Sequence, residues 1–254
     1  MINCPKHPSR RAVIENVAGA TVLGSLLSVV GTAPATVNAK GVSDTDILNF
    51  ALNLEYLEAE FYNYAVNGRG IGALGVDLRG TGTSGATVGG SKVALNDPLM
   101  AATAQQLAYD ELTHVNLLRS ALGKDAIAKP TIDLSALKLG FRSPGEFLTL
   151  ARAFEDTGVS AYGGAAPLIA SKDTLGTAAR ILSAESQHAG VIRFMLVQHG
   201  VTVPALDSSD VVPGANGTNI FSVNKDALSI VRTPEQVLAI AKPFFPNGLN
   251  GAIK

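Results

Sequence analysis

Two of the four histidines in this 254-residue chain follow a glutamate by three positions. The pairs are Glu111 with His114 and Glu185 with His188. On a helix, residues three apart share one face, so the carboxylate and the imidazole of each pair can bind the same ion. The only cysteine is Cys4, which excludes a site built from several thiolates. These spacings predict a metal site made of oxygen and nitrogen ligands.

A second spacing also occurs twice, a glutamate followed seven positions later by a tyrosine. Glu55 precedes Tyr62, and Glu155 precedes Tyr162. Seven residues are about two helical turns, so each pair shares a stripe. Each pair is followed by one Glu-x-x-His pattern, which indicates duplication of a helical hairpin. We expect both tyrosines to be hydrogen-bonded to ligand carboxylates in the core and to be candidate catalytic residues, with a redox role as the alternative.

Four carboxylates and two imidazoles are brought to one core by this arrangement. The predicted metal ligands are Glu55, Glu111, His114, Glu155, Glu185 and His188. Such a set suits two divalent ions, iron or manganese, with Glu111 and Glu185 as the bridging carboxylates. Exposed ion pairs on helix surfaces are the alternative, but on core positions these charges would be unstable without cations. Glu58 is a further candidate ligand or hydrogen-bond acceptor, and Glu60 is expected in solvent.

The apolar periodicity predicts four long helices that position these residues. They are expected at about 44–66, at 97–122, from Ser143-Pro144 onward, and at 173–199. The glycines and Pro167 in the third helix predict a kink or a close helix crossing near 163–167. Four helices of this length are enough for one four-helix bundle.

Two segments lack this periodicity. Residues 67–96 are rich in glycine and predict an irregular insertion that covers one end of the bundle. Residues 200–254 predict an irregular tail with a helical patch at 234–241 and strands only in short pieces. The predicted fold class is therefore all-α, a four-helix bundle over 40–199 with the C-terminal extension packed on it.

The N-terminus has the layout of a signal peptide. Arg10 and Arg11 precede a moderately apolar run at 17–31, and small residues follow it. The arginine pair resembles a twin-arginine signal. We expect residues 1–39 to be removed, with cleavage between Ala35 and Ala39. The mature protein would then be exported, periplasmic or extracellular, with no stable membrane span.

Charge and hydropathy narrow the partners. The chain has 20 basic and 21 acidic residues, so no overall positive field attracts nucleic acid. A hydrophobic content of 46% excludes a disordered chain. We expect a small-molecule oxidant as the partner and no nucleic acid, and homo-oligomerisation stays open.

Three stretches resemble one known family: residues 49–62, 232–238 and 244–251. The chain is similar there to ferritin-like proteins that include plant desiccation-related proteins, fungal stress-response proteins and exported bacterial members. The resemblance implies a ferritin-like bundle with a di-iron or di-manganese site. We expect redox chemistry on dioxygen or peroxide, as a peroxidase, a catalase-like enzyme or a metal oxidase. The alternatives are a non-catalytic stress protein with a structural or vestigial metal site, and an iron-storage cage, which the tail would obstruct.

Overall fold

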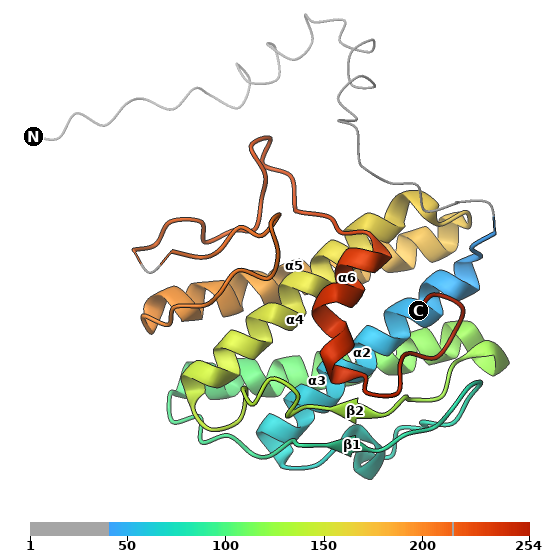
Figure 1. Ribbon diagram of the computed structural model, residues 1–254, viewed down its shortest axis with the longest axis horizontal. Coiled ribbons are helices and arrows are strands. Elements are labelled where there is room, and N and C mark those ends of the chain that lie inside the picture. The colour runs from blue at the N-terminus through green and yellow to red at the C-terminus, as the bar shows by residue number, and fades with distance from the viewer. Residues whose placement is uncertain (1–40, 215) are drawn as a thin grey trace, which may run out of the picture. The chain divides into compact units, whose positions relative to one another are not determined.

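Four long helices form a bundle in the computed structural model, which describes residues 41–214 and 216–254 (Figure 1). They are α2 (Asp44–Asn67), α3 (Pro98–Leu122), α4 (Pro144–Ala165) and α5 (Lys172–Gln198). A shorter helix, α6 (Pro234–Ala241), follows in the C-terminal segment. The predicted all-α bundle is confirmed. The predicted signal peptide, residues 1–39, lies outside the described residues.

The long helices pair as two hairpins. In the first, Asn63 near the end of α2 donates a hydrogen bond to the carbonyl of Ala108 in the first half of α3, so the two helices run antiparallel. In the second, residues 166–171 connect α4 to α5. The hairpins meet where α2 crosses α4, and there Tyr62 donates a hydrogen bond to Glu155. The two copies of the repeated motif therefore face each other across the core.

Each long helix begins after a side chain that accepts hydrogen bonds from the first turn. The capping residues are Ser43, Asp97, Ser143 and Ser171. In α3 and α4 a proline follows the cap, where its missing N–H leaves no hydrogen bond unmade. Gly68, with a φ of 70°, ends α2 in the left-handed conformation that a side chain disfavours. The four helices start within one residue of their predicted positions.

The third helix does not continue through Pro167 as a kinked helix, contrary to the prediction. It ends at Ala165, and Pro167 lies in a 3-10 turn, η3 (Ala166–Leu168). Proline lacks the N–H that would bond to the preceding turn, so the helix stops instead of bending. The glycines near this point instead allow the C-terminal segment to pack closely on α4. A Cβ on Gly164 would lie only 2.2 Å from the carbonyl oxygen of Arg232.

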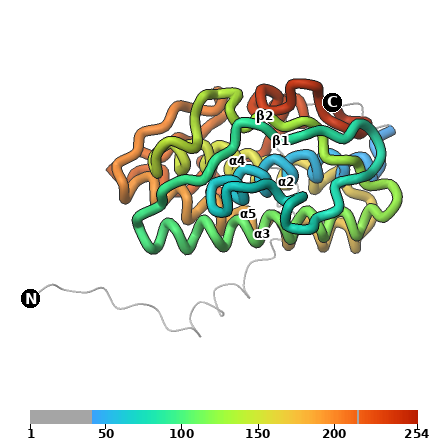
Figure 2. The backbone as a smooth tube through the Cα atoms, turned by 90° about the horizontal axis from the view of Figure 1, so that it is seen from below, coloured from blue at the N-terminus to red at the C-terminus, as the bar shows by residue number. Residues whose placement is uncertain are grey.

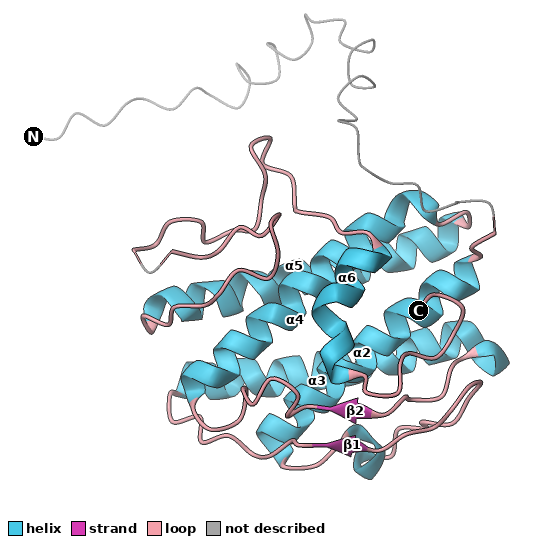
Figure 3. Ribbon diagram, viewed as in Figure 1, coloured by secondary structure: helices cyan, strands magenta, loops and turns pink. Residues whose placement is uncertain are grey.

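The glycine-rich insertion contains short regular elements. A 3-10 turn, η1 (Ile71–Leu74), is followed by β1 (Thr87–Val88), which pairs in parallel with β2 (Ile132–Asp133) in the α3–α4 connection (Figure 3). This pair corrects the expectation that strands occur only in the tail. Glycine permits the contact, because a Cβ on Gly85 would lie 2.2 Å from the backbone nitrogen of Thr131.

We had predicted that the insertion covers one end of the bundle. It instead runs along α2 (Figure 2). The N–H of Val93 donates to the carbonyl of Ala65, in the last turn of α2, at 2.8 Å. The segment that pairs with the insertion reaches the other end of this helix, where the N–H of Ile127 donates to the Asn49 side chain at 3.1 Å. The N–H groups of Thr81 and Gly85 in the insertion donate to the carbonyls of Ala126 and Lys129 in the α3–α4 connection, each at 2.9 Å, which satisfies them without a helix.

The C-terminal segment packs against α4. Arg232 is buried, and its guanidinium donates to Asp207 at 2.7 Å and to the Ser160 hydroxyl at 3.0 Å. The Phe244 ring packs edge-on against Phe154 of α4, with centroids 5.0 Å apart. Among residues 41–214 and 216–254, no helix is long and apolar enough to cross a membrane.

Candidate metal centre

The six predicted ligands meet in the middle of the bundle. They are Glu55 on α2, Glu111 and His114 on α3, Glu155 on α4, and Glu185 and His188 on α5. All four carboxylates are fully buried, and the two histidines are 8% and 7% exposed. Each residue was predicted at a core-facing position of its own helix. The helical period places all six side chains inward.

The six residues form two overlapping groups. One contains Glu55, Glu111, His114 and Glu185, and the other contains Glu111, Glu155, Glu185 and His188. Within each group, one ligand atom from every residue lies within 4.8 Å of all the others. Glu111 and Glu185 belong to both groups, which is the geometry expected of two carboxylates shared by two ions.

One ring nitrogen of each histidine faces the carboxylates. His114 Nδ1 lies 3.1 Å from Glu111 Oε2 and 3.3 Å from oxygens of both Glu55 and Glu185. His188 Nδ1 lies 2.9 Å from Glu111 Oε1 without hydrogen-bond alignment. Several oxygens around one nitrogen at these distances resemble the ligands of one ion more than a set of hydrogen bonds.

Several atoms of the centre have no hydrogen-bond partner in the described part of the chain. These buried atoms are Glu55 Oε2, Glu111 Oε1, Glu155 Oε2, both oxygens of Glu185, and His188 Nδ1. A buried polar atom without a partner is costly, and six of them at one place need a common partner. Divalent cations that accept hard oxygen and imidazole ligands meet this need, so the residues fit a pair of such ions.

The metal-free centre retains protons. Burial raises the pKa of Glu111 to about 7, although its contacts with both histidines lower it. Burial and the carboxylates of Glu111 and Glu155 raise the pKa of Glu185 well above its usual range. Burial alone would lower the pKa of His188, but the carboxylates of Glu111 and Glu155 reverse this and raise it to about 12. Cations would take the place of these protons.

The two tyrosines contact carboxylates of the opposite hairpin. Tyr62 donates to Glu155 Oε1, and Tyr162 donates to Glu55 Oε1, each at 2.6 Å. Both rings are buried. Each tyrosine therefore orients the carboxylate that belongs to one ligand group only.

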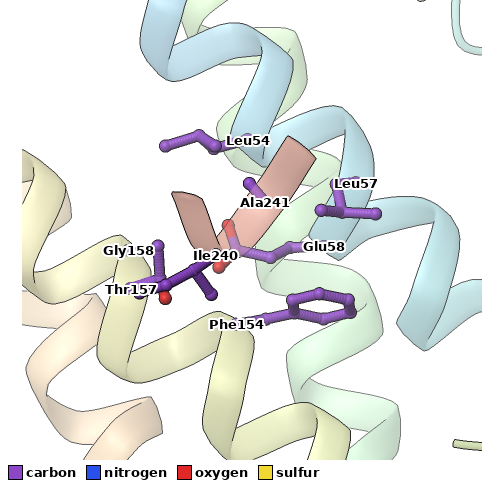
Figure 4. Close-up of a pocket in the computed structure, with 8 residues that line it drawn as sticks. All are labelled: Leu54, Leu57, Glu58, Phe154, Thr157, Gly158, Ile240 and Ala241. Carbon is purple, nitrogen blue, oxygen red and sulfur yellow. The ribbon is translucent and has the colours of Figure 1, made fainter. Parts of the chain in front are cut away.

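Glu58 lies beside the centre and not among either ligand group. It is buried, and it lines a narrow pocket between α2, α4 and α6 (Figure 4). A Cβ on Gly158 would lie 3.1 Å from Glu58 Oε1 and 2.5 Å from Glu185 Oε2. Because Gly158 has no side chain, the carboxylates of Glu58 and Glu185 both fit beside it.

Two acidic residues differ from the expectations. Glu60 was expected in solvent but is buried, because the insertion and the α3–α4 connection cover it. Lys129 Nζ of the connection lies 3.9 Å from Glu60 Oε1, and a Cβ on Gly70 of the insertion would lie 2.3 Å from its other oxygen. Asp110 was missed, although it directly precedes Glu111, and its Oδ2 lies 3.2 Å from His188 Nε2. The feature of the sequence that could have identified Asp110 is its position directly before the predicted ligand Glu111.

Fold and site together define a class of protein: a four-helix bundle around a buried carboxylate–histidine site of the dimetal type. Residues 43–198, more than half of the chain, match the family described as the ferritin-like domain, and the chain belongs to this family. The resemblance found in the sequence is thereby confirmed.

Two relatives cover most of the chain. The ferritin-like catalase Nec2 of Nesocodon mauritianus is 25% identical over an alignment of 277 positions, which covers 86% of this chain and 88% of that protein. The desiccation-related protein PCC13-62 of Craterostigma plantagineum is 28% identical over an alignment of 244 positions, which covers 77% of this chain and 76% of that protein.

Proposed function

We propose that this chain is a dimetal oxidoreductase that disproportionates hydrogen peroxide in stress protection. One observation carries the proposal: the buried ligand atoms of six residues converge in two groups that share Glu111 and Glu185, and five of these residues have ligand atoms without a hydrogen-bond partner. The choice of peroxide over dioxygen is supported by the relative named a ferritin-like catalase, which aligns with 86% of the chain. Two molecules of peroxide yield two of water and one of dioxygen, so no further oxidant or reductant is needed.

The cofactor in this proposal is a pair of manganese or iron ions. Such ions would relay electrons from one peroxide molecule to the next, because manganese and iron each have more than one accessible oxidation state. The ligands would be the six buried residues described above, and Glu111 and Glu185 belong to both groups.

The surrounding residues orient the ligands and pack closely around them. Tyr62 and Tyr162 each orient one unshared carboxylate through a short hydrogen bond. Phe61 packs against Tyr62 with ring centroids 5.0 Å apart, and Phe147 packs against the same tyrosine at 6.0 Å. A rigid, buried surrounding strengthens the electrostatic interactions of the centre.

Oxygen release from hydrogen peroxide by the purified chain tests the proposal. We expect turnover after loading with Mn²⁺ or Fe²⁺ and only the buffer rate after treatment with a chelator. Glu185→Ala should also reduce turnover to the buffer rate, while the exposed Tyr109→Phe should leave it unchanged. A loaded protein that holds two ions and releases no oxygen would contradict the proposed reaction.

The rival is a non-catalytic stress protein whose ions only stabilise the bundle. It is favoured by the similarity to a protein named desiccation-related. In that case, ion loading would raise the melting temperature and would not produce peroxide turnover. Measuring both properties on the same sample separates the two functions.

We also propose that the protein acts outside the cytoplasm. The arginine pair at positions 10 and 11 and the apolar run at 17–31 support export. A folded passenger that already holds its metal would suit the twin-arginine route.

A further inference from the structure

Asp110 contacts one of the two histidines of the centre from outside. Its Oδ2 lies 3.2 Å from His188 Nε2, while His188 Nδ1 lies 2.9 Å from Glu111 Oε1. The two ring nitrogens therefore face opposite partners. A neutral imidazole that binds an ion through Nδ1 carries its proton on Nε2, and Asp110 is the acceptor for that proton.

A second side chain holds Asp110 in place. Gln106, one turn earlier on α3, donates from Nε2 to Asp110 Oδ1 at 2.7 Å. Both residues line an open pocket between α3 and α5, together with His188. The Asp110 side chain is 26% exposed, so replacing it removes a charge without opening a hole in the core.

The other half of the duplicated site has no such aspartate. Asp110 directly precedes Glu111, and the residue that directly precedes Glu185 is Ala184, which lines the same pocket. In the described part of the chain, the carboxylates within 4.0 Å of His114 all lie at its Nδ1, and they are those of Glu55, Glu111 and Glu185. The two copies of the sequence motif therefore place their histidines, His114 and His188, in different environments.

We infer that Asp110 is a positioning residue that makes the two ion positions unequal, so that the ion held by Glu155 and His188 binds more tightly and is filled first. The inference rests on the proposed pair of ions. A carboxylate that accepts the second N–H of a ligating imidazole fixes the orientation of the ring and raises its basicity, and loss of such a partner costs about 10–100-fold in metal affinity.

Titration of the metal-free full chain with Mn²⁺ tests the inference, with bound ions counted per chain. The wild type should take up two ions in two resolved steps. Asp110→Ala and Asp110→Asn should weaken the first step by about 10–100-fold and leave the other unchanged. Gln187→Ala is the matched control, because Gln187 lines the same pocket but donates to the Ser183 carbonyl at 3.1 Å. This variant should titrate like the wild type.

Loading with Co²⁺ gives a spectroscopic readout, because the visible absorption of each bound ion reports its own ligands. Asp110→Asn should change the band that fills first, which a purely structural role would not do.

The outcomes separate this inference from the proposed function. If the wild type binds two ions and both Asp110 variants keep both affinities within about threefold, the inference is overturned and the dimetal proposal stands. Equal affinities for the two ions in the wild type would also overturn it. If the folded wild type binds neither Mn²⁺ nor Co²⁺, the dimetal proposal fails and the inference fails with it.

Discussion

The Tyr62 hydroxyl donates a hydrogen bond to Glu155 Oε1, and the two oxygens are 2.6 Å apart. The partners lie on α2 and α4, so the bond joins the two halves of the duplicated motif. Tyr162 and Glu55 form the reciprocal bond at the same distance. Each half of the centre is thus held in shape by the other half.

Removal of the Tyr62 hydroxyl tests whether these reciprocal hydrogen bonds stabilise the centre. In Tyr62→Phe, a buried carboxylate oxygen loses its donor, so we expect the metal-free protein to lose about 1–3 kcal/mol of unfolding free energy. Affinity for the ion next to Glu155 should fall more than affinity for the other ion. Urea denaturation in chelator and ion titration measure the two effects. Tyr109→Phe, at an exposed ring on α3, is the control and should change stability by less than about 0.5 kcal/mol.

Shared and unshared ligands should respond differently to substitution. His114 belongs to one ligand group, so His114→Ala should reduce the occupancy of one ion. Glu185 belongs to both groups, so Glu185→Ala should reduce the occupancy of both. Elemental analysis of the dialysed variants gives the ions per chain. Equal losses in the two variants would contradict the assignment of Glu185 as a shared ligand.

Metal removal should reverse the pH dependence of stability. In the metal-free protein, burial raises the pKa of Glu111 to about 7, so the folded state binds more protons than the unfolded state between the ordinary glutamate pKa and pH 7. Its stability therefore falls as the pH rises through this range. Ions require deprotonated ligands, so ion affinity and the stability of the loaded protein should rise over the same range.

Thermal melts at pH 5.5 and 7.5, with chelator and with excess Mn²⁺, check this prediction. At free ion 100-fold above the dissociation constant, each site adds about 2.7 kcal/mol. Calorimetry in two buffers of different ionisation enthalpy should show proton release on binding. A metal-free protein that is more stable at pH 7.5 than at 5.5 would contradict the prediction.

We expect ion binding to require glycine at position 158, because a side chain there would contact the carboxylates of Glu58 and Glu185. The Cβ of Gly158→Ala would lie 2.5 Å from Glu185 Oε2, so the shared carboxylate must move, and we expect ion affinity to fall by about 10–100-fold. Gly176→Ala is the matched control on α5, where a Cβ meets nothing within 4 Å. This control should stabilise the protein by about 0.5–1 kcal/mol and bind ions normally.

Export predicts a defined N-terminus. The full chain, expressed in a host with both export routes, should yield a protein outside the cytoplasm that begins near Lys40. N-terminal sequencing measures this directly. Changing both Arg10 and Arg11 to Lys should retain the chain in the cytoplasm if it uses the twin-arginine route. Exported protein that still begins at Met1 would contradict cleavage.

Local periodicity explains why the helices and the six residues of the centre were predictable. Glu111 and His114 lie on one face of a helix because residues three apart always do, whatever packs against them. The caps at Ser43 and Asp97 act within a single turn, and the observed helix starts agree with them. These features depend only on neighbours along the chain.

The remaining features depend on contacts between distant segments. The sequence alone determined that two Glu-x6-Tyr and two Glu-x-x-His patterns would line helix faces, and tertiary packing decided that Tyr62 would hold Glu155 of the other hairpin. Packing also buried Glu60 beneath the insertion and brought Asp110 to His188, 78 positions away along the chain. Helical period sets the face on which a side chain lies, but the partner across that face is set by how whole helices cross.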